Sequence, residues 1–119
     1  MKHENIGESL ATAFSGLLFA LRHQKNSRYL AVIAVTVTAA SPFLGLSAVE
    51  YMVLALTISM VIITELINSG LEYAIDLVTE DYHHLAKAAK DVTAAAVLVA
   101  CGNAAIVAAI FIVSRLKGS

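Results

Sequence analysis

A run of mostly apolar residues from Tyr51 to Thr64 continues, without a proline or glycine, into a stretch rich in acidic side chains. Continued as one helix, at about 100° per residue, this stretch places three acids and one amide on a stripe roughly 80° wide. The four residues are Glu65, Asn68, Glu72 and Asp76, called the acidic stripe below. Aligned acids on a helix that is apolar elsewhere repel one another unless a cation compensates them. Because Mg²⁺ prefers carboxylate oxygens, the acidic stripe predicts a Mg²⁺-binding site, with solvated charges beyond a membrane span as the alternative.

The composition assigns the whole chain to a membrane. Of its 119 residues, 59% are hydrophobic and 14% are charged. A soluble domain carries roughly 25% charged residues, so we expect an integral membrane protein. The length allows one domain, residues 1–119, with about three spans. A net charge of −1 without a basic aromatic surface excludes nucleic acid as a partner, and the single Cys101 excludes a disulfide framework.

The hydrophobic pattern predicts an all-α membrane protein. Residues 6–21 carry apolar side chains at helical spacing, which indicates an amphipathic helix in the membrane interface or, equally, a helix packed on a core. Transmembrane spans are expected at about residues 29–46, 48–78 and 92–113, and Pro42 ends the first. The second would be about 46 Å long, more than the roughly 30 Å hydrocarbon layer, so its last turns should extend into water.

The basic residues predict the orientation of the spans. Six lie before the first span or between the second and third, namely Lys2, Arg22, Lys25, Arg28, Lys87 and Lys90. Two, Arg115 and Lys117, lie on the other side. Because basic residues favour the cytoplasmic face, we expect a multi-pass protein with a cytoplasmic N-terminus and a cytoplasmic acidic stripe, where ATP and Mg²⁺ are available.

Acids at a lipid boundary with lysines on the same side suit phosphoryl transfer. That reaction needs a metal between carboxylates and phosphates, cations near the developing charge, and a base for the incoming hydroxyl. Glu65 lies at the depth where a membrane-embedded alcohol would present its hydroxyl, and partial desolvation there suits a general base. Lys87, Lys90 and Asp91 follow on the same side of the membrane. We therefore expect ATP as co-substrate, Mg²⁺ as cofactor and a membrane lipid alcohol as acceptor.

These residues also resemble a known signature. The motif Glu65-Leu66-Ile67-Asn68-Ser69, followed by Glu72, Asp76 and residues 84–91, resembles that of the small prokaryotic diacylglycerol kinase family, and the resemblance covers about residues 9–113. It implies a homotrimer of three-span protomers, each with an amphipathic N-terminal helix, and active sites shared between protomers. It also implies a location in the bacterial inner, or cytoplasmic, membrane.

The resemblance implies a role for each candidate residue. Glu65 would be the catalytic base and Glu72 a metal ligand. Gln24 falls where the family usually carries a second metal-binding glutamate, so it becomes a candidate ligand without charge. The supporting polar residues would be Asn68 and Asp76, and we add Arg28 from the basic segment before the first span. The residues expected to contact ATP are Asp81, Tyr82, His83, Lys90 and Asp91.

The acceptor lipid is open to two readings. Residues 76–91 look closest to the undecaprenol kinase branch of the family, so we expect phosphorylation of undecaprenol, with diacylglycerol as the alternative acceptor. A reading of another class is a non-catalytic three-helix membrane oligomer that retains the fold. The neutral Gln24 favours that reading, whereas the intact acidic stripe with Lys90 and Asp91 favours the enzyme.

Overall fold

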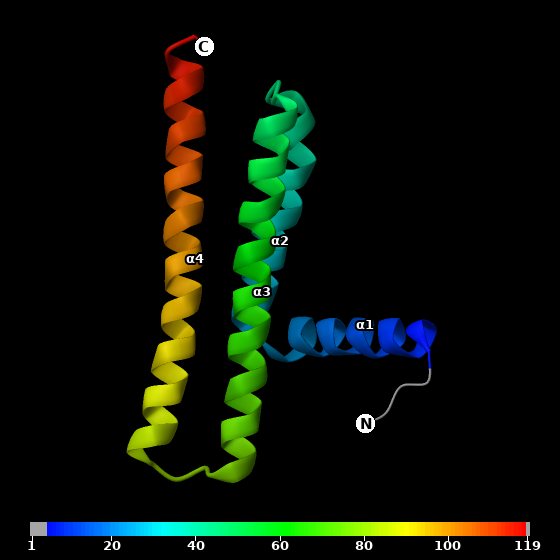
Figure 1. Cartoon of the computed structure of the whole chain (residues 1–119), viewed down its shortest axis with the longest axis vertical. Coiled ribbons are helices and arrows are strands. Elements are labelled where there is room, and N and C mark those ends of the chain that lie inside the picture. Colours follow the sequence, from blue (N-terminus) through cyan, green and yellow to red (C-terminus); the bar gives the residue numbers. More distant parts are fainter. Residues whose placement is uncertain (1–4, 119) are drawn as a thin grey trace.

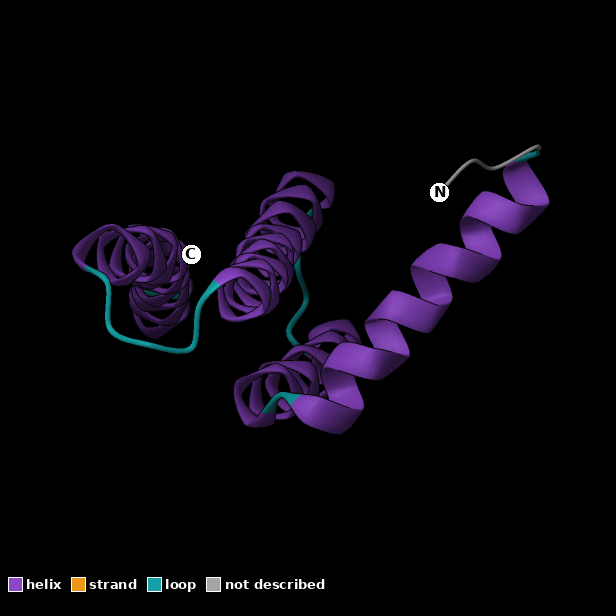
Figure 2. Ribbon diagram, turned by 90° about the horizontal axis from the view of Figure 1, so that it is seen from below, coloured by secondary structure: helices purple, strands orange, loops and turns teal. Residues whose placement is uncertain are grey.

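The chain folds into four α-helices and one short 3₁₀ helix, and a computed structural model describes residues 5–118. No strand occurs within that range, so the all-α prediction is confirmed there. The elements are α1 (Ile6–His23), α2 (Lys25–Ala40), η1 (Ser41–Phe43), α3 (Ala48–Val78) and α4 (His84–Leu116). Helices α2, α3 and α4 run up and down beside one another, and α1 projects sideways from them (Figure 1). Figure 2 shows α3 between α2 and α4.

Local sequence explains where the helices begin and end. The Asn5 side chain caps α1 by accepting a hydrogen bond from the Glu8 N–H at 2.8 Å. Ser47 and Glu50 form a reciprocal capping box at the start of α3. Gln24 is extended, with φ −113° and ψ 114°, and it is both the C-cap of α1 and the N-cap of α2. One non-helical residue therefore makes the elbow that turns α1 away from α2.

The structure corrects the predicted spans. Helix α2 has 16 residues and ends at Ala40, and Pro42 lies in η1, so the helix ends close to Pro42 as predicted, while the predicted span of residues 29–46 runs past that end. Sixteen residues extend only about 24 Å. The two helices in the described range that are long and apolar enough to cross a membrane are α3 and α4. Helix α3 has the bounds predicted for it, and α4 extends beyond the predicted 92–113 at both ends.

Burial in this chain is the reverse of that in a soluble protein. The buried apolar residues of the described range are two alanines, Ala20 and Ala100. The buried polar residues are Ser27, Ser41, Thr57, Glu65, Asn68 and Ser69. Large apolar side chains lie outside instead, such as Leu98 at 73% exposed. Soluble proteins bury such residues, so lipid or other membrane helices must cover these faces.

Helix α4 is tied to the rest of the chain at both ends. Near its C-terminus, the Arg115 guanidinium lies 3.0 Å from Glu50 of α3. Near its N-terminus, the Lys90 ammonium lies 2.7 Å from Asp76 of α3. Between these ties, residues of α2, α3 and α4 line an apolar cavity of about 490 Å³. The two ion pairs thus join α4 to α3 near both ends of α4, and the apolar cavity lies between them.

Candidate functional site

The acidic stripe runs along one side of α3 and becomes more exposed toward the end of the helix. Glu65 is 4% exposed and Asn68 is 8% exposed, whereas the Asp76 side chain is 55% exposed. Asn68 Nδ2 donates to Glu72 Oε1 at 3.2 Å, and Ser69 Oγ donates to Glu65 Oε2 at 3.3 Å. These bonds join neighbours four residues apart, as helical geometry allows. The structure therefore brings the predicted stripe together, and it adds Ser69.

Glu65 lines a cavity of about 230 Å³ enclosed by α1, α2 and α3. The rest of the lining is apolar except for Ser27. Ser27 is 7% exposed, and its hydroxyl oxygen has no hydrogen-bond partner within residues 5–118. The base candidate thus meets an apolar space that suits the chain of a lipid alcohol, with a second polar group on the same wall.

Gln24 lies beside the acidic stripe. Its Nε2 donates to the Tyr73 hydroxyl at 2.8 Å, and Tyr73 directly follows Glu72 in the chain. Sequence reasoning missed both Tyr73 and Ser69. The spacing of four residues between Glu65 and Ser69 was a usable signal. Tyr73 gave none, because its partner is 49 residues away.

Arg28 lies at the elbow between α1 and α2. Its Nη1 donates to the carbonyl oxygens of Leu21 and Arg22 at 3.2 and 3.0 Å. Both carbonyls belong to the last turn of α1, where a cation stabilises the negative end of the helix dipole. Within the described residues, no hydrogen bond joins Arg28 to the acidic stripe, so here it braces the elbow between α1 and α2.

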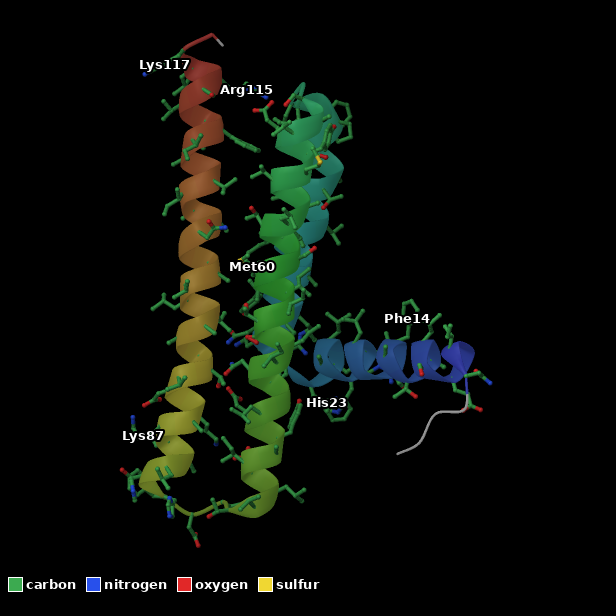
Figure 3. All side chains as sticks on the ribbon, in the orientation of Figure 1. Phe14, His23, Met60, Lys87, Arg115 and Lys117 are labelled. Carbon is green, nitrogen blue, oxygen red and sulfur yellow. The ribbon has the colours of Figure 1, made fainter. Side chains whose placement is uncertain are left out.

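The residues predicted to bind ATP are spread over the loop after α3 and the start of α4. Tyr82 is 80% exposed, and the Asp81 N–H donates to the Thr79 hydroxyl at 3.2 Å. His83 caps α4, since its Nδ1 accepts the Leu85 N–H at 3.1 Å. This segment lies at the end of the molecule where Lys87 is labelled in Figure 3.

Lys90 and Asp91 point to different partners. Lys90 donates to Asp76 and so reaches the acidic stripe. Asp91 instead accepts from Lys87 of its own helix at 2.6 Å. Of the predicted nucleotide contacts, the structure therefore brings Lys90 to the acidic stripe, while Asp91 is held within α4.

The oxygen atoms along the acidic stripe fit a Mg²⁺ ion held partly by phosphate. No three His, Cys, Asp or Glu side chains in the described range gather closely enough to hold a metal alone. Mg²⁺ typically takes one or two carboxylates and completes its shell with phosphate and water. Glu72 offers a carboxylate, and the buried Asn68 Oδ1 has no hydrogen-bond partner within residues 5–118. The amide oxygen of Gln24 is a third candidate ligand.

Comparison with known proteins gives the family. Residues 11–112 match the family described as prokaryotic diacylglycerol kinase. The chain belongs to this family. The prediction made from the motif is thereby confirmed. With two apolar helices long enough to span a bilayer and many exposed large apolar side chains, this member of the family is a membrane protein.

Three relatives show the range of names within the family. A diacylglycerol kinase of Synechocystis is 43% identical over 104 residues, which are 87% of this chain and 59% of that relative. An undecaprenol kinase of Bacillus subtilis is 36% identical over 92 residues, 77% of this chain and 75% of the relative. A diacylglycerol kinase of Escherichia coli K12 is 30% identical over 88 residues, 74% of this chain and 72% of the relative. The chain thus spans less than two thirds of the Synechocystis protein.

Proposed function

We propose that the chain is an Mg²⁺- and ATP-dependent lipid kinase that phosphorylates the hydroxyl of undecaprenol at the cytoplasmic membrane surface. The observation that carries this proposal is the position of Glu65. It is a carboxylate 4% exposed, facing an apolar cavity, at the head of an acidic stripe that ends in the ion pair with Lys90. A lipid kinase needs a site that is apolar at one end and exposed to water at the other. The lipid acceptor reaches it from the membrane, and the ATP donor reaches it from water.

Glu65 is the base in this reaction. Its Oε2 accepts the Ser69 hydroxyl, so Oε1 is the oxygen left to take a proton from the acceptor. As the acceptor oxygen forms a bond to the γ-phosphorus of ATP, the bond from that phosphorus to ADP breaks, and the acceptor proton passes to Glu65. The buried Ser27 hydroxyl, on the wall of the same cavity, is a second group that can orient the alcohol.

Glu72 is the principal metal ligand, with Gln24 and Asn68 as neutral oxygen ligands. When bound there, Mg²⁺ neutralises charge on the transferring phosphate. Asn68 holds the Glu72 carboxylate through its amide hydrogen bond and so orients it. The Lys90 ammonium is partly exposed and can leave Asp76 for a phosphate oxygen.

The loop residues Asp81, Tyr82 and His83, together with Asp91, form the nucleotide side of the proposed site. Exposure supports this role, since Tyr82 presents an open aromatic ring next to the N-terminus of α4. A helix N-terminus also favours bound phosphate.

Diacylglycerol is the second candidate acceptor. The 43% identical relative from Synechocystis carries the name diacylglycerol kinase, which favours this alternative. The resemblance of residues 76–91 to the undecaprenol kinase branch favours undecaprenol, and the relative from Bacillus subtilis bears that name.

We further propose a homotrimer in the inner membrane, with a cytoplasmic N-terminus, three spans per protomer and shared active sites. Helix α2 would cross the membrane together with η1, which adds three residues beyond Ala40. The apolar cavity between α4 and the other helices supports assembly, because such a space is stabilised when another apolar group fills it. The basic residues at the end that bears the acidic stripe support the orientation; Lys2 among them lies outside the described residues.

Phosphate transfer from labelled ATP tests the proposal. The purified protein in mixed micelles is given undecaprenol or diacylglycerol, and the labelled lipid is measured with and without Mg²⁺. We expect undecaprenol to be the better acceptor and Glu65→Gln to be inactive. If diacylglycerol were the better acceptor, it would replace undecaprenol as the proposed substrate. No transfer to either lipid by a correctly folded oligomer would favour the non-catalytic reading.

A further inference from the structure

A cluster of three aromatic rings and one amide fastens the elbow between α1 and α2 to α3. The Phe19 ring stacks on His23 with centroids 4.1 Å apart, and it meets the Tyr73 ring edge to face at 5.4 Å. The Tyr73 hydroxyl then accepts the hydrogen bond from Gln24 Nε2 at 2.8 Å. Figure 3 labels His23 at this junction, where α1 meets the helices that run up and down.

The hydrogen bond to Tyr73 occupies the Nε2 end of the Gln24 amide. The amide carries two donors on Nε2 and two acceptor positions on Oε1. Because Nε2 is the end directed at the hydroxyl, Oε1 is the end without a hydrogen-bond partner within residues 5–118. Oε1 is also the atom of the side chain that can bind a hard cation, since Mg²⁺ prefers oxygen ligands.

A neutral ligand depends on orientation more than a charged one does. A carboxylate attracts a cation from a distance and presents an oxygen on either side, whereas an amide that turns over presents its NH₂ group to the cation. A freely rotating glutamine side chain also loses conformational entropy when it is held by a ligand. Both costs fall if a neighbour holds the amide before the cation arrives.

We infer that Tyr73 is a positioning residue that holds the Gln24 side chain in place, with its amide oxygen left available to Mg²⁺. This inference rests on the proposed function, since it deepens the assignment of Gln24 as a ligand. Tyr73 follows Glu72 directly on α3, so the positioning residue and the principal ligand share one rigid helix. A residue that supports a metal ligand typically contributes roughly 10–100-fold in metal affinity.

The competing account is that Tyr73 merely fastens the elbow. Its ring packs on Phe19, and that contact alone would hold α1 against α3. Tyr73→Phe separates the two accounts, because it keeps the ring and removes the hydroxyl. Tyr29→Phe is the matched control, since Tyr29 lies on α2 with no hydrogen bond from its hydroxyl among those the structure records in the described range.

The test measures binding of Mn²⁺, a hard divalent probe, by electron paramagnetic resonance with a non-hydrolysable ATP analogue present. We expect Tyr73→Phe to weaken Mn²⁺ binding about tenfold, with an unchanged unfolding midpoint. Tyr29→Phe should bind Mn²⁺ like the original protein. In a chain that already carries Gln24→Ala, Tyr73→Phe should have no further effect, because the residue it orients is gone.

Two results would overturn the inference. One is equal Mn²⁺ binding by Tyr73→Phe and the original protein. The other is an equal loss from Tyr73→Phe in the Gln24→Ala background, which would show that the hydroxyl acts elsewhere. The binding measurement needs no turnover, so it is separate from the proposed function. If the protein showed the expected Mn²⁺ pattern but transferred no phosphate, the kinase proposal would be contradicted. The inference that Tyr73 positions Gln24 would still hold.

Discussion

Two ion pairs join α4 to α3, and they differ in how completely each cation is held. Lys90 has one partner in the described structure, Asp76, at 2.7 Å, and the two side chains are 39% and 55% exposed. Arg115 lies 3.0 Å from Glu50, with side chains 35% and 25% exposed. The first pair stands at the end that bears the acidic stripe, and the second at the opposite end.

Both side chains of the pair between Arg115 and Glu50 also form hydrogen bonds with backbone atoms. Arg115 Nε donates to the Leu44 carbonyl at 3.3 Å, and its Nη2 lies 3.5 Å from the Gly45 carbonyl. Glu50 at the same time accepts the Ser47 N–H at 2.9 Å as part of the capping box of α3. Gly45 has φ +64°, a conformation that favours glycine and lets the turn bring its carbonyl to Arg115.

The contrast teaches that the same helix pair is fixed at one end and adjustable at the other. A guanidinium with several fixed acceptors is a structural tie. An ammonium with one exposed acceptor can exchange that carboxylate for a phosphate. We therefore expect substitutions near Lys90 to change activity and substitutions near Arg115 to change stability.

The largest effect should come from Glu65 near the middle of α3, compared with Glu50 in the first turn of the same helix. Glu65→Gln removes the base, and we expect kcat to fall about 10²–10⁴-fold with little change in the unfolding midpoint. Glu50→Gln, the matched control, should lower the midpoint and leave kcat close to the original value. The checks are the rate of phosphate transfer and thermal unfolding in detergent. A Glu65→Gln protein with more than a third of the original kcat would contradict the assignment.

Glu72→Ala should act on the metal rather than on the lipid. Loss of the principal ligand should raise the Mg²⁺ concentration for half-maximal rate by at least about tenfold, because even supporting residues contribute that much. The measurement is a Mg²⁺ titration at fixed ATP. The KM for the acceptor serves as the internal control and should stay unchanged. An unaltered Mg²⁺ curve would mean that the ion is held elsewhere.

Lys90→Gln and Arg115→Gln test the two ties directly. We expect the first to raise the KM for ATP several-fold, since a hydrogen bond to a charged group contributes about 1.5–3 kcal/mol, part of which water replaces. We expect the second to lower the unfolding midpoint by a few degrees without changing that KM. If both substitutions lowered stability equally and left the KM alone, the distinction between the two ends would fail.

The smallest effect should come from Gln24→Glu. A carboxylate here adds a charge to the proposed metal site, and Tyr73 can then donate its hydroxyl proton to it. We expect the Mg²⁺ concentration for half-maximal rate to fall a few-fold. Superimposable Mg²⁺ curves would show that Gln24 does not contact the ion.

Periodic elements were well predicted from the sequence. The predicted bounds of α3 match the structure. Ser47 caps the helix, no proline interrupts it, and its glycine, Gly70, occurs late. The acidic stripe followed from the same periodicity. The sequence placed Lys90 on the same side of the predicted spans as the acidic stripe, although it did not give the Asp76 partner that the structure shows.

Contacts between distant segments were not predicted. The bond between Gln24 and Tyr73 depends on the angle of the elbow, which is set by the extended backbone of a single residue. Pro42 marked the end of the first helix, but the predicted span ran on to residue 46, because the apolar run continues past Ala40 while the backbone is already 3₁₀ at Pro42. Hydrophobicity does not record that change.

Because the ion pair between Arg115 and Glu50 fixes one end of α3, the depth of Glu65 and Glu72 in the membrane depends on the thickness of the bilayer. In the proposed orientation this tie marks one boundary of the hydrocarbon layer, where basic side chains settle. Glu65 lies about 22 Å farther along the helix and Glu72 about 33 Å. In a layer of about 30 Å, the base then lies beneath the opposite surface while the metal ligand clears it. A thinner membrane would bring Glu65 toward the headgroups, so acyl chain length of the surrounding lipid would set the depth at which the alcohol is deprotonated.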